Sequence, residues 1–329
     1  MMDRRTFLVR ASGMVGGAVC AAGIAEDTPP FAFHDDGSRL TILERGRPVL
    51  TYRYAEVAPP EGVAQKFRRA CYIHPLHGVD GEVVTEDFPA DHYHHRGVFW
   101  AWPNCHVGDR KLNVWELGGA RQVFQRWVVR QATPAAARIE VQNTWRFDDD
   151  GLAPISEQVR FVVQPIESGS RAIDFELKCT NVTDDPVEFK GSSAPASPGA
   201  TVAKGYGGFC FRPDASRKPF TFTTAKGVMA EDTMSCETPW ADVSWDGPHK
   251  AGVAIFQHPS NPGFPHPGWI LRHYGFLGAS WPHNDPHTLN PGESFTLRYR
   301  LLVHAGNAGD ADVPELAEHY ARTASAGTA

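Results

Sequence analysis

Apolar and β-branched residues alternate with polar ones at every second position through much of the chain. A period of two is typical of a strand with one buried and one exposed face. It predicts strands at 40–43, 49–54, 138–147, 155–163, 172–178, 187–190 and 294–303. Turn signals rich in Asp, Asn, Gly and Pro separate these segments, as between the strands of an antiparallel sheet.

Helical periodicity occurs at 313–322 and in the N-terminal leader. No sequence repeat or domain boundary interrupts the strand pattern, and the Ser-, Ala- and Pro-rich stretch 191–199 is short enough for a loop. Together with 31 Gly and 26 Pro, the pattern predicts an all-β fold, a large antiparallel β-sandwich. We expect a single domain over residues 26–322, followed by a disordered tail over 323–329.

The N-terminus carries the pair Arg4-Arg5, followed by Thr-Phe-Leu and then by a Gly- and Ala-rich stretch up to Ala25. This arrangement predicts a twin-arginine signal peptide over residues 1–25, cleaved before Glu26. The stretch is too short to span a bilayer, and no later segment approaches that length. The expected mature protein therefore has no membrane span and is periplasmic or otherwise exported.

Charge and cysteine spacing exclude several classes of protein. The formal net charge is −6 and basic runs are absent, which argues against nucleic acid as a partner. Cysteines in the predicted mature chain are widely spaced and form no CxxC pair, so neither a disulfide framework nor a thiolate metal site is indicated. We expect them to be small buried hydrophobic residues. The sequence leaves disulfide pairing and oligomeric state open.

Histidine is the unusual residue, with 15 in the chain. A first cluster spans residues 72–102, where an extended backbone would project His92 and His94 to one face and His95 to the other. Polar groups next to an aromatic run suit a sugar, whose apolar face stacks on rings while its hydroxyls need hydrogen bonds. The candidate catalytic residues here are Glu86, Asp87, His92, His94 and His95, and the candidate substrate-binding residues are Arg96 and Trp100.

A second cluster, over residues 258–284, is rich in Pro and Gly and therefore resembles a set of loops. It supplies His273 as a candidate catalytic residue and His258, Trp269, Arg272 and Tyr274 as candidate substrate-binding residues. Arg212 is a further candidate, at the end of the Gly-rich segment 204–212, whose glycines would admit close approach by a ligand. We expect the two clusters to face a shared cleft.

Two chemistries fit these residues. Histidine titrates near neutral pH, so with a carboxylate partner it can transfer protons to or from a sugar oxygen without a cofactor. Alternatively, His92 and His94 could bind Cu or Zn. The first hypothesis is a carbohydrate-active enzyme (a hydrolase, lyase or epimerase) acting on a sugar or glycoside. A non-catalytic carbohydrate-binding protein and a metal-dependent enzyme are the alternatives.

The segments His74-Pro-Leu-His-Gly, His92-Tyr-His-His-Arg-Gly and Arg272-His-Tyr-Gly resemble the DUF6807 family, which also carries the label PmoA family. That label suggests methane oxygenase, whose membrane helices this chain lacks. At the level of fold, Asp174–Val187 is similar to a strand–turn–strand stretch of galactose mutarotase-like supersandwich proteins. The resemblance implies a supersandwich and carbohydrate chemistry. Where aldose epimerases carry a catalytic His-Pro-x-Phe, this chain has Gly191-Ser-Ser-Ala-Pro, so mutarotation itself is not implied.

Overall fold

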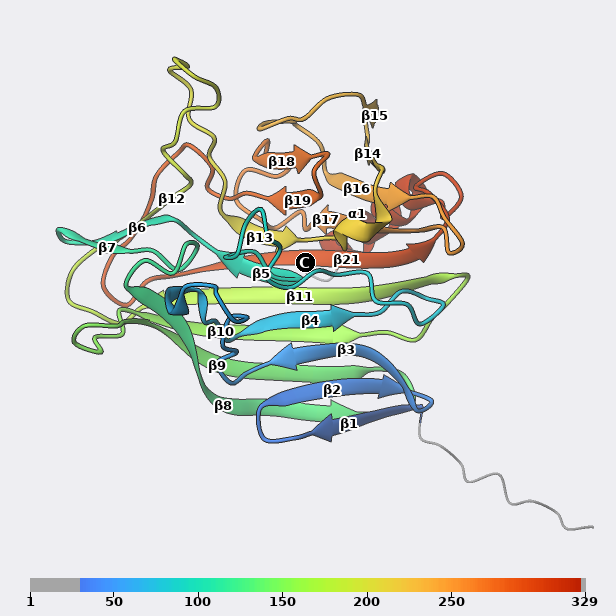
Figure 1. Cartoon of the computed structure of the whole chain (residues 1–329), viewed down its shortest axis with the longest axis horizontal. Helices are drawn as coiled ribbons and strands as arrows, with labels where there is room; N and C mark the ends of the chain where they lie inside the picture. The colour runs from blue at the N-terminus through green and yellow to red at the C-terminus, as the bar shows by residue number, and fades with distance from the viewer. Residues whose placement is uncertain (1–29, 327–329) are drawn as a thin grey trace, which may run out of the picture.

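The computed structural model describes residues 30–326 of the 329-residue chain. Two large antiparallel sheets lie face to face, with their strands overlaid in Figure 1. The predicted signal peptide lies outside the described residues. No helix in the described part of the chain has the length and apolar character needed to cross a membrane.

The first large sheet has eight strands and contains most of the N-terminal third of the chain. In spatial order they are β1 (Phe31–Asp35), β2 (Arg39–Glu44), β3 (Arg47–Arg53), β4 (Tyr72–Leu76), β5 (Val98–Ala101), β13 (Gly208–Phe211), β19 (Phe276–Ala279) and β18 (Trp269–Arg272). The long connection between β4 and β5 carries the first histidine cluster. The β18–β19 hairpin, which carries part of the second cluster, lies at one edge of the sheet.

The second large sheet has nine strands. Their spatial order is β15 (Gly227–Met229), β14 (Phe220–Thr224), β16 (Trp240–Trp245), β17 (Ala251–Gln257), β21 (Ser294–Ala305), β11 (Ser170–Asn181), β10 (Ile155–Val163), β9 (Ala137–Phe147) and β8 (Ala120–Ala132). The last strand of the described residues, β21, therefore lies in the middle of this sheet, between β17 and β11.

The remaining elements are small. A four-stranded sheet contains β20 (His287–Leu289), β12 (Val187–Lys190), β6 (Asn104–Val107) and β7 (Arg110–Leu112). Two short 3-10 helices, η1 (Gln65–Phe67) and η2 (Ala215–Arg217), lie in connections, and the helix α1 spans Val313–Ala326. The predicted all-β antiparallel sandwich is confirmed, and each segment predicted as a strand forms one.

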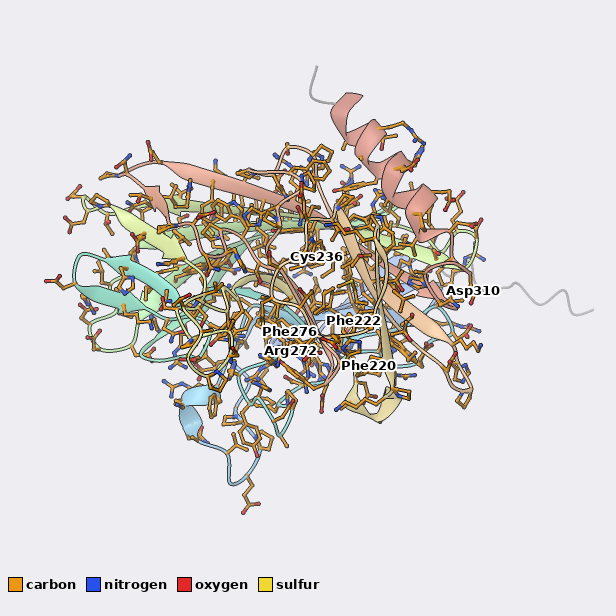
Figure 2. All side chains as sticks on the ribbon, turned by 90° about the horizontal axis from the view of Figure 1, so that it is seen from above. Phe220, Phe222, Cys236, Arg272, Phe276 and Asp310 are labelled. Atoms are coloured by element: carbon orange, nitrogen blue, oxygen red, sulfur yellow. The ribbon has the colours of Figure 1, made fainter. Side chains whose placement is uncertain are left out.

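The core lies between the two large sheets. Side chains from both sheets meet there: the ring of Phe209 on β13 lies 4.9 Å from that of Phe175 on β11 and 4.9 Å from that of Tyr299 on β21. The cysteines of the described residues are all buried and unpaired, as expected of small hydrophobic residues. Seen from above, side chains fill the space between the layers (Figure 2).

One carboxylate lies inside this core. Glu157 on β10 has no exposed surface, and its oxygens accept hydrogen bonds from the side chains of Trp100 (3.0 Å), Gln122 (2.9 Å), Trp145 (2.8 Å) and Asn143 (2.8 Å). Burial raises the pKa of Glu157, and these hydrogen bonds oppose the rise. Because Trp100 belongs to β5, this group also links the two large sheets.

Helix α1 covers part of the outer face of the nine-stranded sheet (Figure 2). Val313, Ala317 and Tyr320 pack there on Phe256 and Leu302. The helix continues to Ala326, so residues 323–326 are helical and the expected tail does not begin at 323. The hydroxyl of Thr323 donates to the carbonyls of His319 and Tyr320, which satisfies groups at the end of the helix.

Candidate functional site

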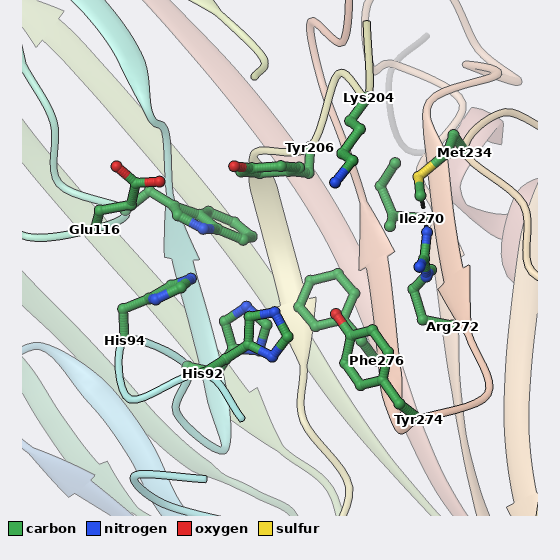
Figure 3. A pocket seen from close by; sticks show the side chains of 12 residues that line it. His92, His94, Glu116, Lys204, Tyr206, Met234, Ile270, Arg272, Tyr274 and Phe276 are labelled. Atoms are coloured by element: carbon green, nitrogen blue, oxygen red, sulfur yellow. Dashed lines mark hydrogen bonds between the residues drawn. The ribbon is translucent and has the colours of Figure 1, made fainter. Parts of the chain in front are cut away.

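A cavity of about 470 Å³ opens beside the β18–β19 hairpin (Figure 3). Four separate parts of the chain line it: the β4–β5 connection, the segment after β7, the loop before β13, and β18 and β19 with the segment that precedes them. The lining residues are His92, His94, His95, Trp115, Glu116, Lys204, Tyr206, Met234, Ile270, Arg272, Tyr274 and Phe276. The two histidine-rich clusters of the sequence thus meet in one cavity.

The histidines of the first cluster lie on a turn. The backbone N–H of His95 donates to the carbonyl of His92 over 2.8 Å, which folds the chain back on itself. The extended backbone expected from the sequence is therefore wrong here. Because of this turn, the side chains of His92, His94 and His95 all face the cavity.

The three imidazoles form a compact group. The rings of His92 and His95 are stacked, with centroids 4.6 Å apart and planes 3° apart, and the ring of His94 lies edge-on to His95 at 4.6 Å. On its other side, His92 stacks on Tyr274 at 5.1 Å, while His95 packs on Phe276 at 4.8 Å. Nδ1 of His92 lies 3.2 Å from Oδ2 of Asp91, so a carboxylate accompanies this imidazole.

Trp115 and Tyr206 form an aromatic wall, with ring centroids 5.0 Å apart. The side-chain oxygen of Asn113 accepts hydrogen bonds from the backbone N–H groups of Trp115 and Glu116, which fixes the turn that carries them. On the other side, Gly205 has φ +66° and packs so closely on the ring of His283 that a Cβ there would lie 2.4 Å from it. At Gly205, the close approach expected of a ligand is thus made by a protein side chain.

A buried arginine joins the histidine turn to the aromatic wall. Nη1 of Arg69 donates to the carbonyl of His94 over 3.1 Å, and Nη2 donates to the carbonyls of Val114 and Trp115. The guanidinium has no carboxylate partner in the described part of the chain, and burial lowers its pKa to about 9. Its role is to position both walls of the cavity.

Burial sets the protonation states of the site. It lowers the pKa of His94 to about 3, helped by the charge of Arg69, and it lowers the pKa of His95 well below its ordinary value. Burial also raises the pKa of the Tyr274 hydroxyl to about 12. Near pH 7 the imidazoles of His94 and His95 are therefore neutral and can accept hydrogen bonds, and the Tyr274 phenol is neutral and can donate one.

The neutral state of His94 predicts a pH-dependent stability. The imidazole of His94 binds a proton less readily in the folded protein than in the unfolded chain. Its contribution to the unfolding free energy is therefore complete above about pH 6.5 and is lost as the pH falls toward 3. As the pH falls from 6.5 to 4, the unfolding free energy should decrease less steeply in His94→Gln than in the wild type. The two slopes should differ by at most about 1.4 kcal/mol per pH unit. Urea unfolding across this range measures the slope. The exposed control His34→Gln should keep the wild-type slope, and an unchanged slope in His94→Gln would contradict the prediction.

Comparison with protein-family models shows to which family the chain belongs. Residues 39–318 match the model of a family of unknown function, DUF6807. The chain belongs to the DUF6807 family. This confirms the family resemblance seen in the sequence, and the match covers every residue that lines the cavity. Comparison with curated proteins finds no match for this DUF6807 chain.

Solved structures with similar folds include several carbohydrate-active enzymes. The galactosidase domain of an alpha-galactosidase–sucrose kinase is 11% identical, with a TM-score of 0.45, and the match covers 84% of this chain and 42% of that one. Heparan sulfate lyase HepC from Pedobacter heparinus is 6% identical (TM-score 0.38; 85% and 36% covered), and a GalM/aldose epimerase homologue from C. elegans is 9% identical (TM-score 0.37; 84% and 100% covered). The DUF6807 chain thus spans about two fifths of the galactosidase chain. Similarities at this level do not identify a reaction.

Four charged candidates of the sequence lie behind the cavity of the DUF6807 protein, and none of them lines it. Arg96 is fully buried: it donates to the carbonyls of Phe67, Tyr93 and His95, and its Nε lies 3.2 Å from Asp87. Arg212 is bound by Asp91 (2.7 Å) and Glu86 (3.3 Å). With their charges engaged in this way, Glu86, Asp87, Arg96 and Arg212 hold the histidine turn in place and do not line the cavity.

The remaining candidates lie elsewhere. Trp100 and Trp269 have no exposed surface, and their indole N–H groups donate to Glu157 and to the carbonyl of Thr238, so both are core residues. His258 lines a different cavity, near Tyr320 on α1. His273 points away from the site, where Nδ1 lies 2.9 Å from Asp232. Of the expected residues, His92, His94, His95, Arg272 and Tyr274 are the ones that converge.

Sequence reasoning did not single out Trp115 or Glu116, although an Asn two residues before a lone Trp is the signal of a turn that presents it. Lys204 and Tyr206 lie in the Gly-rich segment 204–212, whose glycines are its prominent sequence feature. Met234, Ile270 and Phe276 are ordinary apolar residues whose place at the cavity depends on the fold alone. Among the described residues, no group of three or more His, Cys, Asp or Glu side chains is arranged to hold a metal ion.

Proposed function

We propose that this protein is an exported enzyme that acts on a saccharide by proton transfer between its side chains and a sugar carbon or oxygen. The observation that carries the proposal is the convergence of His92, with its carboxylate neighbour, and the Tyr274 phenol on one cavity beside an aromatic wall. A volume of about 470 Å³ is in the range of small-molecule sites, roughly 300–1,000 Å³.

The side chains divide into three roles. Trp115 and Tyr206 offer ring surface for the apolar face of a sugar. His92 accepts a proton at Nε2, and the Asp91 carboxylate, 3.2 Å from Nδ1, stabilises the positive charge that the imidazole gains. Tyr274 donates the proton that a departing or re-forming oxygen requires. His94 and His95, neutral through burial, hydrogen-bond sugar hydroxyls without adding charge.

The proposal is tested by a saccharide screen with the purified mature protein. Binding is followed by thermal shift, and turnover by the appearance of reducing ends, of unsaturated products and of epimers. Binding together with a product supports the enzyme. Binding without any product favours the non-catalytic carbohydrate-binding protein instead, and a screen without any binding contradicts both.

The metal-dependent alternative has its own measurement. Copper or zinc at His92 and His94 predicts a stoichiometric metal in protein purified from the periplasm, and loss of turnover in a chelator with recovery on adding that metal back. The acid–base proposal predicts turnover that does not change with chelator. The same preparation tests export, because the mature N-terminus should begin at Glu26.

A further inference from the structure

The charged groups that line the cavity are unevenly distributed. Lys204 and Arg272 lie on one side with Met234 and Ile270, and Glu116 lies on the opposite side with His94 (Figure 3). Glu116 is exposed, and Asn113 donates to its carboxylate over 3.1 Å. The side formed by Lys204 and Arg272 therefore has no carboxylate of its own among the residues that line the cavity.

Lys204 is a positive charge without a partner. It is half-buried, its backbone is fixed by a 2.7 Å hydrogen bond to the carbonyl of Ala194, and its ammonium forms no ion pair within the described residues. A partly desolvated ammonium with unused donors is costly unless an anion or water completes its hydrogen bonds. The aromatic ring of Tyr206, two residues on, lines the same cavity.

Arg272 is only partly neutralised. Its Nε lies 2.9 Å from Oδ2 of Asp232, but Nη1 has only the sulfur of Met234, at 3.6 Å, which is a weak acceptor. Asp232 also binds His273, through the backbone N–H at 2.7 Å and through Nδ1 at 2.9 Å. The carboxylate of Asp232 is thus shared, and it holds the guanidinium in place with N–H groups left for a ligand.

We propose that the saccharide bound here is acidic, with a carboxylate such as that of a uronic acid lying between Lys204 and Arg272. This inference rests on the proposed function and narrows its substrate class. The sugar ring lies against Trp115 and Tyr206, its carboxylate meets the two cations, and its opposite edge meets the histidines. A neutral sugar of the same shape would bury the Lys204 ammonium and leave it unpaired, so the site discriminates by charge.

The test is titration calorimetry with D-glucuronate and D-galacturonate against the matched neutral sugars D-glucose and D-galactose. The acids should bind at least about tenfold more tightly, since one charged hydrogen bond accounts for that ratio, and the preference should shrink at high salt. Lys204→Met should remove most of this preference, because it weakens binding of the acids and relieves the neutral sugars of a buried, unpaired ammonium. Lys204→Arg should retain the preference.

Lys178→Met is the matched control, because it removes the same charge from an exposed position on β11 outside the cavity. It should keep the preference for acids. If neutral sugars bind as tightly as acids, or if Lys204→Met keeps the preference, the acidic-substrate inference is overturned while the carbohydrate function stands. If none of the four sugars nor any saccharide of the screen binds, the proposed function fails as well.

Discussion

Replacing His92 by glutamine should lower turnover of an accepted saccharide by about 10²- to 10⁴-fold, the usual contribution of a positioned acid–base group. Glutamine retains a hydrogen-bonding head of similar length but cannot accept a proton near neutral pH. The loss should appear in kcat with little change in KM, because the ring contacts from Trp115 and Tyr206 remain. Steady-state kinetics on the best substrate of the screen gives both constants.

His258→Gln is the control for this substitution. His258 was a candidate from the sequence, but it lies in a cavity beside α1, so its replacement should leave kcat and KM unchanged. Tyr274→Phe should lower kcat as His92→Gln does and should remove the alkaline limb of the pH–rate profile, if the phenol is the acid. Turnover that survives both His92→Gln and Tyr274→Phe would contradict the proposed roles.

Replacing Glu157 by glutamine should destabilise the folded protein by about 3 kcal/mol, the order of a buried charged hydrogen-bond group that loses an acceptor. Four side-chain donors converge on the two carboxylate oxygens, and an amide would present an N–H₂ group to at least one of them. A buried donor would then face another donor across the core. Urea unfolding and the thermal midpoint measure the loss.

The exposed control Glu61→Gln makes the same chemical change at a position where no donor converges on the carboxylate, and it should stay within about 0.5 kcal/mol of the wild type. A loss of less than 1 kcal/mol in Glu157→Gln would show that the four donors do not require an anion. The expected midpoint shift in Glu157→Gln is downward by several degrees, since 1 kcal/mol corresponds to about 2–4 °C in a chain of roughly this size.

The strands were predictable because their burial is one-sided. In β10, Ile155, Val159 and Val163 face the core and alternate with half-buried or exposed residues, so the period of two marks the strand from end to end. Strand β8 has no such pattern: after Ala120 to Gln122 most of its residues are exposed or half-buried, because it lies at the edge of its sheet. The sandwich was therefore predictable, whereas the order of its strands was not.

The site was predictable in part. Clustering of histidine and arginine pointed to the right loops, but clustering does not reveal which charges are used internally. Arg96 and Arg272 look alike in sequence, yet the first is enclosed by three carbonyls and Asp87 while the second lines the cavity. The same limit applies to tryptophan, since Trp100 is a core residue and Trp115 is a wall of the site.

The position of β21 has a consequence for biosynthesis. This strand joins β17 on one side to β11 on the other, so without it the nine-stranded sheet is two separate parts, β8–β11 and β14–β17. Among the strands of the described residues this one is synthesised last, and its pairing with β11 is among the most distant in sequence. The two parts of this sheet therefore stay unjoined until Ser294–Ala305 has been synthesised, and a chain truncated before Ser294 would expose both unpaired edges to other chains.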